Sequence, residues 1–281
     1  MTLIVARKTA DGIQMVADTQ VSDQRETHIG PIRHGVLKCI ALSPSRCIGF
    51  AGNLELAKDA LRWCFEHRNV TDEEIRRHLL RAHQSSHADT DFIFATLNDG
   101  GSLDRVTDHS LQQGLEVAHI GEHAAFELYQ RFTRSEAPWR GAETHPASKM
   151  REAFSAVIEE GSIRSVGGFA VSVGARQGGR GFRYLPYAHG SGFRPVEHTT
   201  EPTSMLRTLG AQGGSYNYSV LVPSEPGVGA IGIYVQEGSF GAFFNPVTRW
   251  VPVVIREVRS DEFIAIIDGE HHVKLVGIGF T

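Results

Sequence analysis

The chain has 281 residues, of which 41% are hydrophobic and 21% charged, and its formal net charge is -4. This composition supplies enough apolar side chains for a packed core and excludes a disordered or a fibrous chain. The slightly acidic balance argues against a general nucleic-acid binder, and no apolar run reaches the roughly 20 residues of a membrane-spanning helix. Three scattered cysteines do not form a disulfide framework and indicate core thiols. We therefore expect a cytoplasmic protein without a nucleic-acid or membrane partner.

Apolar, partly β-branched runs predict paired strands at the start of the chain. Residues 3–6 and 13–18 are separated by Asp11-Gly12, a dipeptide typical of a tight hairpin turn. Two more strands are expected at 36–42 and 46–51, after a polar loop at 22–34. No export signal precedes residues 3–6, so we expect a core strand to begin at the second residue.

The hydrophobic period then changes to that of helices. Apolar residues recur at helical spacing over about 53–67, and Thr71 with Glu74 forms a capping box that predicts a second helix. Strands at 91–98 and 115–120, helices at 124–132 and 147–159, and strands at 168–175 and 181–184 are expected to follow. Two helix pairs among antiparallel strands predict a layered α+β sandwich.

The last third of the chain differs in composition. The segment from 195 to 214 is rich in Thr, Pro, Ser and Gly, which indicates a connection. Short strands are expected after it at 219–222, 230–236, 240–244, 251–258, 263–267 and 273–276. We predict a layered domain at residues 1–195 and a β-rich C-terminal extension at residues 196–281.

Residues near the N-terminus form a candidate catalytic group. Removal of Met1 is expected because Thr2 is small. It would leave Thr2 with a free α-amine beside its hydroxyl. The unperturbed pKa of such an amine is about 7.7–8.0, so it can act as the base that the hydroxyl needs. The hairpin places Asp18 within about 10 Å of Thr2. Lys38 lies on an otherwise apolar strand face, where a buried lysine either pairs with a carboxylate or loses its proton, and Asp18 is the candidate partner. The N–H of Gly52, at a strand-to-helix junction, suits charge stabilisation on an attacked carbonyl.

Four segments carry these residues: Thr2-Leu3-Ile4-Val5, Val16-Ala17-Asp18-Thr19-Gln20-Val21-Ser22, Leu37-Lys38-Cys39-Ile40 and Ile48-Gly49-Phe50-Ala51-Gly52-Asn53. Together they resemble the proteasome β-subunit superfamily of N-terminal-nucleophile hydrolases, nearest to the bacterial ATP-dependent protease peptidase subunit and its relatives. The resemblance implies a four-layer αββα sandwich followed by the β-rich extension. It also implies that Thr2 is nucleophile and base, that Asp18 and Lys38 complete a triad, and that the Gly52 amide is the oxyanion donor.

The same resemblance extends the site to a later loop. Ser165 is retained in Ser162-Ile163-Arg164-Ser165-Val166-Gly167-Gly168, whereas Ser162 stands where the family carries an Asp. Glu122 stands where the family often supplies a serine close to the nucleophile. The resemblance further implies a homo-oligomeric ring or related assembly, and it leaves an ATPase partner open.

The predicted reaction is hydrolysis of amide bonds in a peptide or unfolded protein through an acyl-enzyme on Thr2 Oγ1, with no metal or organic cofactor. Two alternatives stay open. One is a catalytically silent, structural subunit of a proteasome-like assembly, and the other is a non-proteolytic amidase, acylase or transpeptidase. His83 and His87, four apart on an expected helix, lack a third ligand at a convincing spacing, so we expect a solvated helix face and no metal site.

Overall fold

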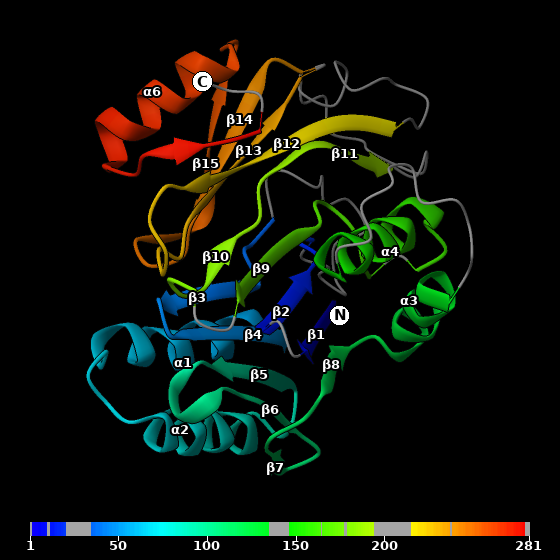
Figure 1. The fold of residues 1–281 in the computed structure, drawn as a ribbon, viewed down its shortest axis with the longest axis vertical. Coiled ribbons are helices and arrows are strands. Elements are labelled where there is room, and N and C mark those ends of the chain that lie inside the picture. Colours follow the sequence, from blue (N-terminus) through cyan, green and yellow to red (C-terminus); the bar gives the residue numbers. More distant parts are fainter. Residues whose placement is uncertain are drawn as a thin grey trace.

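The computed structural model describes residues 2–9, 12–20, 35–134, 146–163, 165–176, 179–193, 215–236 and 238–278. Figure 1 shows two helix pairs on different sides of the strands and a separate C-terminal helix. The strands are β1 (Leu3–Thr9), β2 (Gly12–Ala17), β3 (Cys39–Ser43), β4 (Arg46–Gly52), β5 (Thr90–Thr96), β6 (Ser102–Thr107), β7 (Ser110–Gln112), β8 (Val117–Gly121), β9 (Val171–Arg176), β10 (Arg183–Tyr184), β11 (Tyr187–Phe193), β12 (Ser215–Pro223), β13 (Ile231–Val235), β14 (Phe240–Asn245), β15 (Arg249–Arg256) and β16 (Leu275–Val276). The helices are α1 (Leu54–Glu66), α2 (Asp72–Ser85), α3 (His123–Arg134), α4 (Pro146–Glu160), α6 (Ser260–His271) and a short 3-10 turn, η1 (Asn98–Gly100).

The strands form three antiparallel sheets. The first sheet has the order β10-β9-β2-β1-β8, and the second has the order β3-β4-β5-β6-β7. The third sheet has the order β11-β12-β13-β14-β15, and β16 pairs with β12. Helices α1 and α2 contact the second sheet, whereas α3 and α4 contact β1, β2 and β9 of the first. Helix α6 contacts β14 and β16 of the third sheet.

Strand β1 shows why its sequence is apolar without alternation. Ile4 points into a core shared by all three sheets. Leu3 and Val5 point to the other face, where they pack against α3 and α4 through residues such as Phe126 and Phe154. Because successive side chains of a strand point to opposite faces, a strand covered on both faces is apolar throughout. Burial on both faces also holds the start of β1, and therefore Thr2, in one place.

The predicted four-layer αββα sandwich with a β-rich extension is wrong as a description of this chain, because the described residues build three sheets and not two. The third sheet is not an appendage to the others. Val220, Ile231 and Phe240 belong to the same buried cluster as side chains of the first two sheets, such as Ile48. The opposite face of the third sheet has its own core, in which Phe243 meets α6.

Most individual elements agree with the sequence predictions. The hairpin is confirmed by pairing of Ile4 with Ala17 and of Thr9 with Gly12, and the capping box of Thr71 is present at the start of α2. The strand expected at 263–267 is wrong, since these residues lie within α6. Phe263 and Ile267, four residues apart, are the buried positions of that helix, and a five-residue apolar run has no period that separates strand from helix.

Some predictions fall on residues outside the described ranges. These are the Asp11 position of the hairpin turn, the polar loop at 22–34 and the connection at 195–214. The proposed domain boundary at residue 195 lies in the last of these segments, so the division into residues 1–195 and 196–281 stays a prediction.

No helix within the described ranges is long and apolar enough to cross a membrane.

Candidate active site

Three strand ends bring Thr2, Asp18 and Lys38 together. Thr2 immediately precedes β1 and Asp18 immediately follows β2, so the hairpin carries the two residues to the same edge of the first sheet. Lys38 immediately precedes β3 of the second sheet. The sequence analysis placed Asp18 opposite about residue 5, but the register Ile4–Ala17 moves it toward Leu3, whose N–H donates to Asp18 Oδ1 at 3.2 Å.

Hydrogen bonds join the three side chains directly. Lys38 Nζ donates to Thr2 Oγ1 at 2.5 Å and to the Asp18 carboxylate at 2.9 and 3.0 Å. The Thr2 hydroxyl donates to Asp18 Oδ1. Asp18 Oδ2 also accepts the N–H groups of Gln20 at 3.2 Å and Gly167 at 3.3 Å. The hydroxyl oxygen is therefore polarised by an ammonium while its proton faces a carboxylate.

The group is withdrawn from solvent. Thr2 is 2% exposed, Asp18 0% and Lys38 4%. Burial lowers the pKa of Lys38, because the charged form loses its hydration, and the neighbouring Asp18 carboxylate opposes this shift. Charge interactions are stronger in such an environment than in water, so Lys38 acts strongly on the Thr2 oxygen.

Gly52 ends β4 and is followed by Asn53, whose side chain caps α1 by accepting the N–H groups of Glu55 and Leu56. Its φ is +107°, and a Cβ at this position would overlap the carbonyl oxygen of Asp89. Only glycine fits such a turn without strain. The predicted strand-to-helix junction is confirmed, whereas the role of the Gly52 amide stays a prediction.

Ser165 lies beside Glu122, whose backbone contacts Thr2. Its hydroxyl donates to Glu122 Oε2 at 3.4 Å, and the N–H of Glu122 donates to the carbonyl of Thr2 at 2.7 Å. Ser162 has a different partner, since its hydroxyl donates to the exposed carboxylate of Glu160. Of the two positions that depart from the family pattern, Glu122 therefore reaches the Thr2 main chain, whereas Ser162 is bonded within its own turn.

Sequence reasoning missed the backbone groups that complete the site. The carbonyl of Gln20 accepts from Lys38 Nζ, and the N–H of Gly167 reaches Asp18. A signal for the approach of β8 was present at Gly121, whose φ is +95° and where a Cβ would overlap the carbonyl oxygen of Thr2. A glycine at the end of an apolar strand marks such a close approach of two backbones.

The histidines and cysteines lie elsewhere. The prediction of a solvated face is wrong for His83, which is fully buried, with Nδ1 2.8 Å from the Thr90 carbonyl and Nε2 accepting from the His109 N–H at 2.9 Å. His87 is exposed. The described residues contain no group of three or more His, Cys, Asp or Glu side chains that could hold a metal ion. The cysteines are free and buried: Cys39, Cys47 and Cys64.

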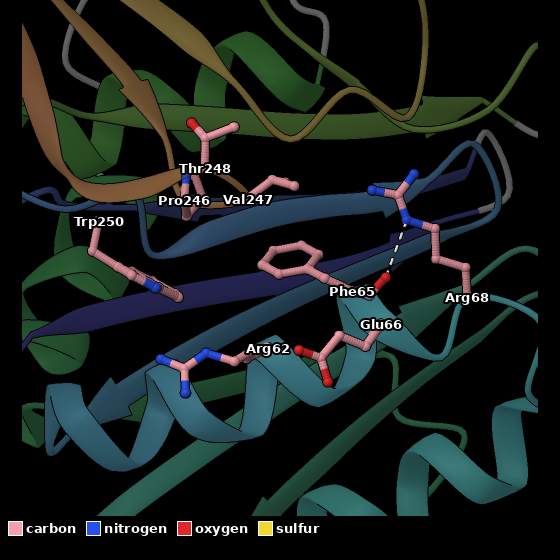
Figure 2. A pocket seen from close by; sticks show the side chains of 8 residues that line it. All are labelled: Arg62, Phe65, Glu66, Arg68, Pro246, Val247, Thr248 and Trp250. Atoms are coloured by element: carbon pink, nitrogen blue, oxygen red, sulfur yellow. Dashed lines mark hydrogen bonds between the residues drawn. The ribbon is translucent and has the colours of Figure 1, made fainter.

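A cavity of about 270 Å³ lies at a different place in the fold. Figure 2 shows its lining side chains, which come from the end of α1, the residue Arg68 beyond it, the turn between β14 and β15, and Trp250 of β15. Phe65 and Trp250 supply its apolar surface, and Arg68 Nε donates to the Phe65 carbonyl at 3.3 Å. The cavity shares no lining residue with the group around Thr2.

Comparison with known proteins gives distant structural likenesses. No family model matches the chain, and no curated protein matches it. Among solved structures it is similar to Anbu from Hyphomicrobium sp. strain MC1, with 16% identity over 62% of this chain and 82% of that chain and a TM-score of 0.46. For the Gly-1 mutant of that Anbu the identity is 18%, over 66% of this chain and 85% of that chain, with a TM-score of 0.48. A likeness of this degree assigns no role to any residue.

These findings correct the family assignment. Membership of the proteasome β-subunit superfamily, nearest to the bacterial ATP-dependent protease peptidase subunit, is wrong as predicted, because no family model supports it and the similar structures named above are those of Anbu. The matching motifs were short and clustered in about the first 67 residues. Short motifs of this kind identify a local arrangement of residues more securely than a family.

Proposed function

We propose that the chain is an amide hydrolase that uses Thr2 as an N-terminal nucleophile. The observation that carries the proposal is the buried contact of Thr2 Oγ1 with both Lys38 Nζ, at 2.5 Å, and Asp18. A threonine hydroxyl is a weak nucleophile unless a base and a positive charge lie beside it. The site supplies the charge directly, and removal of Met1 supplies the base as the α-amine of Thr2.

The proposed reaction begins when the α-amine takes the proton of Thr2 Oγ1. The oxygen then attacks the substrate carbonyl, and the Gly52 N–H is proposed to stabilise the negative charge on the carbonyl oxygen. The ammonium returns its proton to the leaving amine as the amide bond breaks, which leaves an ester on Thr2. The amine next activates a water molecule, which releases the acid product and restores the hydroxyl.

Lys38 and Asp18 have distinct proposed roles. Lys38 lowers the cost of negative charge on Thr2 Oγ1 as the hydroxyl loses its proton. Asp18 fixes Lys38 through contacts of 2.9 and 3.0 Å and is itself fixed by the N–H groups of Leu3, Gln20 and Gly167. The proposed consequence is a preorganised site that needs no reorganisation when charge develops.

We further propose that the substrate is a peptide or an unfolded protein and that the chain acts as a homo-oligomer in the cytoplasm. The edge strand β15 supports the oligomer, since it lies at an end of the third sheet and its Val251 is 54% exposed. The unpaired N–H and C=O groups of an edge strand can pair with a second chain.

Turnover of matched substrates tests the proposal. Wild-type protein, Thr2→Ser, Thr2→Ala and Lys38→Ala are assayed on short fluorogenic peptides and on simple acyl amides. We expect Thr2→Ser to retain activity and Thr2→Ala and Lys38→Ala to lose it. Cleavage of simple amides alone would favour a non-proteolytic amidase, and absence of turnover from the wild type on both substrate sets would favour a catalytically silent subunit.

A further inference from the structure

Glu122 stands directly across from Thr2 where β1 meets β8. The ladder pairs Leu3 with Gly121 and Ile4 with Ile120, so its next step places Thr2 opposite Glu122. The Glu122 N–H donates to the Thr2 carbonyl at 2.7 Å. The Glu122 backbone therefore contacts the main chain of Thr2, the residue that carries the proposed α-amine.

The Glu122 side chain contacts the same loop as Asp18 does. It is partly buried, and Ser165 Oγ donates to its Oε2 at 3.4 Å. Two residues further along the chain, the Gly167 N–H donates to Asp18 Oδ2 at 3.3 Å. One short loop thus contacts the carboxylates of both Asp18 and Glu122.

Resting on the proposed function, we propose that Glu122 is a positioning residue whose carboxylate holds the α-ammonium of Thr2 during acyl transfer. When the amine takes the Oγ1 proton, a second positive charge forms beside Lys38. Asp18 is already engaged by Lys38 and by backbone N–H groups. Glu122 supplies a second carboxylate, which compensates the new charge and makes the amine a stronger base.

Other charged groups on the neighbouring elements have different contacts. On β8, the His119 ring stacks on Phe126 of α3 with 3.7 Å between ring centroids, and its pKa is lowered to about 4 by burial, so it is neutral at pH 7. On α3, His123 faces Glu127 at 3.5 Å on the exposed side of the helix. The charged groups described at the site itself are therefore Asp18, Lys38 and Glu122. Asp18 and Lys38 are buried, whereas Glu122 is only partly buried.

The expected effect follows from the sign of the charge. A carboxylate about 4–6 Å from an ammonium raises the ammonium pKa by roughly one unit or more. Glu122→Gln should therefore lower the pKa of the Thr2 amine by about one unit. The acid limb of the kcat/KM profile should move to lower pH by the same amount, while Glu122→Asp should keep the wild-type position because the charge is retained.

The amine pKa can be measured without turnover. The rate at which cyanate carbamylates the Thr2 amine is followed against pH by mass analysis of the N-terminal peptide, in the wild type, Glu122→Gln, Glu122→Asp and Ser165→Ala. Glu127→Gln is the matched control, since it removes a carboxylate from the exposed side of α3. We expect a shift for Glu122→Gln, a smaller shift for Ser165→Ala and none for Glu127→Gln, with thermal unfolding confirming that each variant folds.

The outcomes separate the two proposals. An amine pKa that Glu122→Gln leaves unchanged overturns the role of Glu122, whether or not the enzyme turns over. A shifted amine pKa in a protein that hydrolyses neither peptides nor amides supports the charge pairing and contradicts the proposed function. A retained Met1 contradicts both, because Thr2 then has no amine.

Discussion

Replacement of Lys38 by Met removes the ammonium from the buried group while keeping a side chain of similar length. Lys38 Nζ donates to Thr2 Oγ1, to both oxygens of Asp18 and to the Gln20 carbonyl. Removal of one partner of a buried ion pair costs about 3–5 kcal/mol, because the other charge is left uncompensated. Asp18 keeps three backbone N–H donors and the Thr2 hydroxyl, so we expect the lower end, about 3 kcal/mol.

This loss should be visible in stability and in activity. At about 2–4 °C per kcal/mol for a protein of more than 150 residues, Lys38→Met should lower Tm by roughly 6–12 °C. Loss of the positive charge at Thr2 Oγ1 should lower kcat by about 10²–10³, the usual cost of removing one preorganised electrostatic group. Urea unfolding measures the first effect, and peptide turnover well below the Tm of the variant measures the second.

Lys58→Met is the matched control. Lys58 Nζ contacts Glu55 Oε1 at 2.6 Å on the surface of α1, and the Glu55 side chain is largely exposed. Such a pair is worth about 0–1 kcal/mol, so this variant should resemble the wild type. A Lys38→Met protein that unfolds like the Lys58→Met protein would refute the argument that the buried pair of Lys38 and Asp18 stabilises the fold. Unchanged turnover would refute the role of Lys38 in the reaction.

Three further predictions concern other parts of the structure. Gly121→Ala should displace Thr2 and abolish turnover, whereas Gly114→Ala, where φ is also positive at +67° but the surrounding space is open, should cost only about 1–2 kcal/mol of stability and no activity. The pKa of His119 is lowered to about 4 in the folded state, against about 6.5 in the unfolded state, so the unfolded state binds more protons between these pH values and stability decreases as the pH is lowered. The Tm of His119→Gln should therefore decrease less than that of the wild type between pH 7 and pH 4.5. An equal decrease in both proteins would contradict this. Burial raises the pKa of the thiols of Cys39, Cys47 and Cys64. Ellman's reagent should therefore label none of them before the protein unfolds. Rapid labelling of the native protein would show that they are accessible and would contradict this.

Local patterns predicted the part of the site that depends on one hairpin. The dipeptide Asp11-Gly12 between two strand-like runs predicted the pairing of β1 with β2, although the register places Asp18 against Leu3 and not opposite about residue 5. The contact of Lys38 was predictable because a lysine buried among apolar side chains pairs with a carboxylate or loses its proton. Its expected place within a strand was wrong, since β3 begins at Cys39. These inferences need only strand geometry and the cost of a buried charge, both of which are properties of short segments.

Contacts between distant segments could not be read from the sequence. Gly167 lies 149 positions from Asp18, and no sequence pattern in either segment predicts the hydrogen bond between them. The third sheet is a similar case. Val220 and Ile231 lie in the core shared with the first two sheets, but their sequence pattern would be the same if they faced a separate core. Apolar periodicity indicates that a face is buried, and it does not say against what.

The central claim is that Thr2, with a free α-amine, is the nucleophile. Its most direct test is peptide mapping by mass spectrometry after treatment with an epoxyketone or a β-lactone, electrophiles that react with an activated hydroxyl. The account predicts an N-terminal peptide that begins at Thr2, carries one equivalent of reagent in the wild type and carries none in Thr2→Ala. An N-terminal peptide that retains Met1, or a free Thr2 that stays unlabelled under conditions in which Thr2→Ser is also inert, would contradict it.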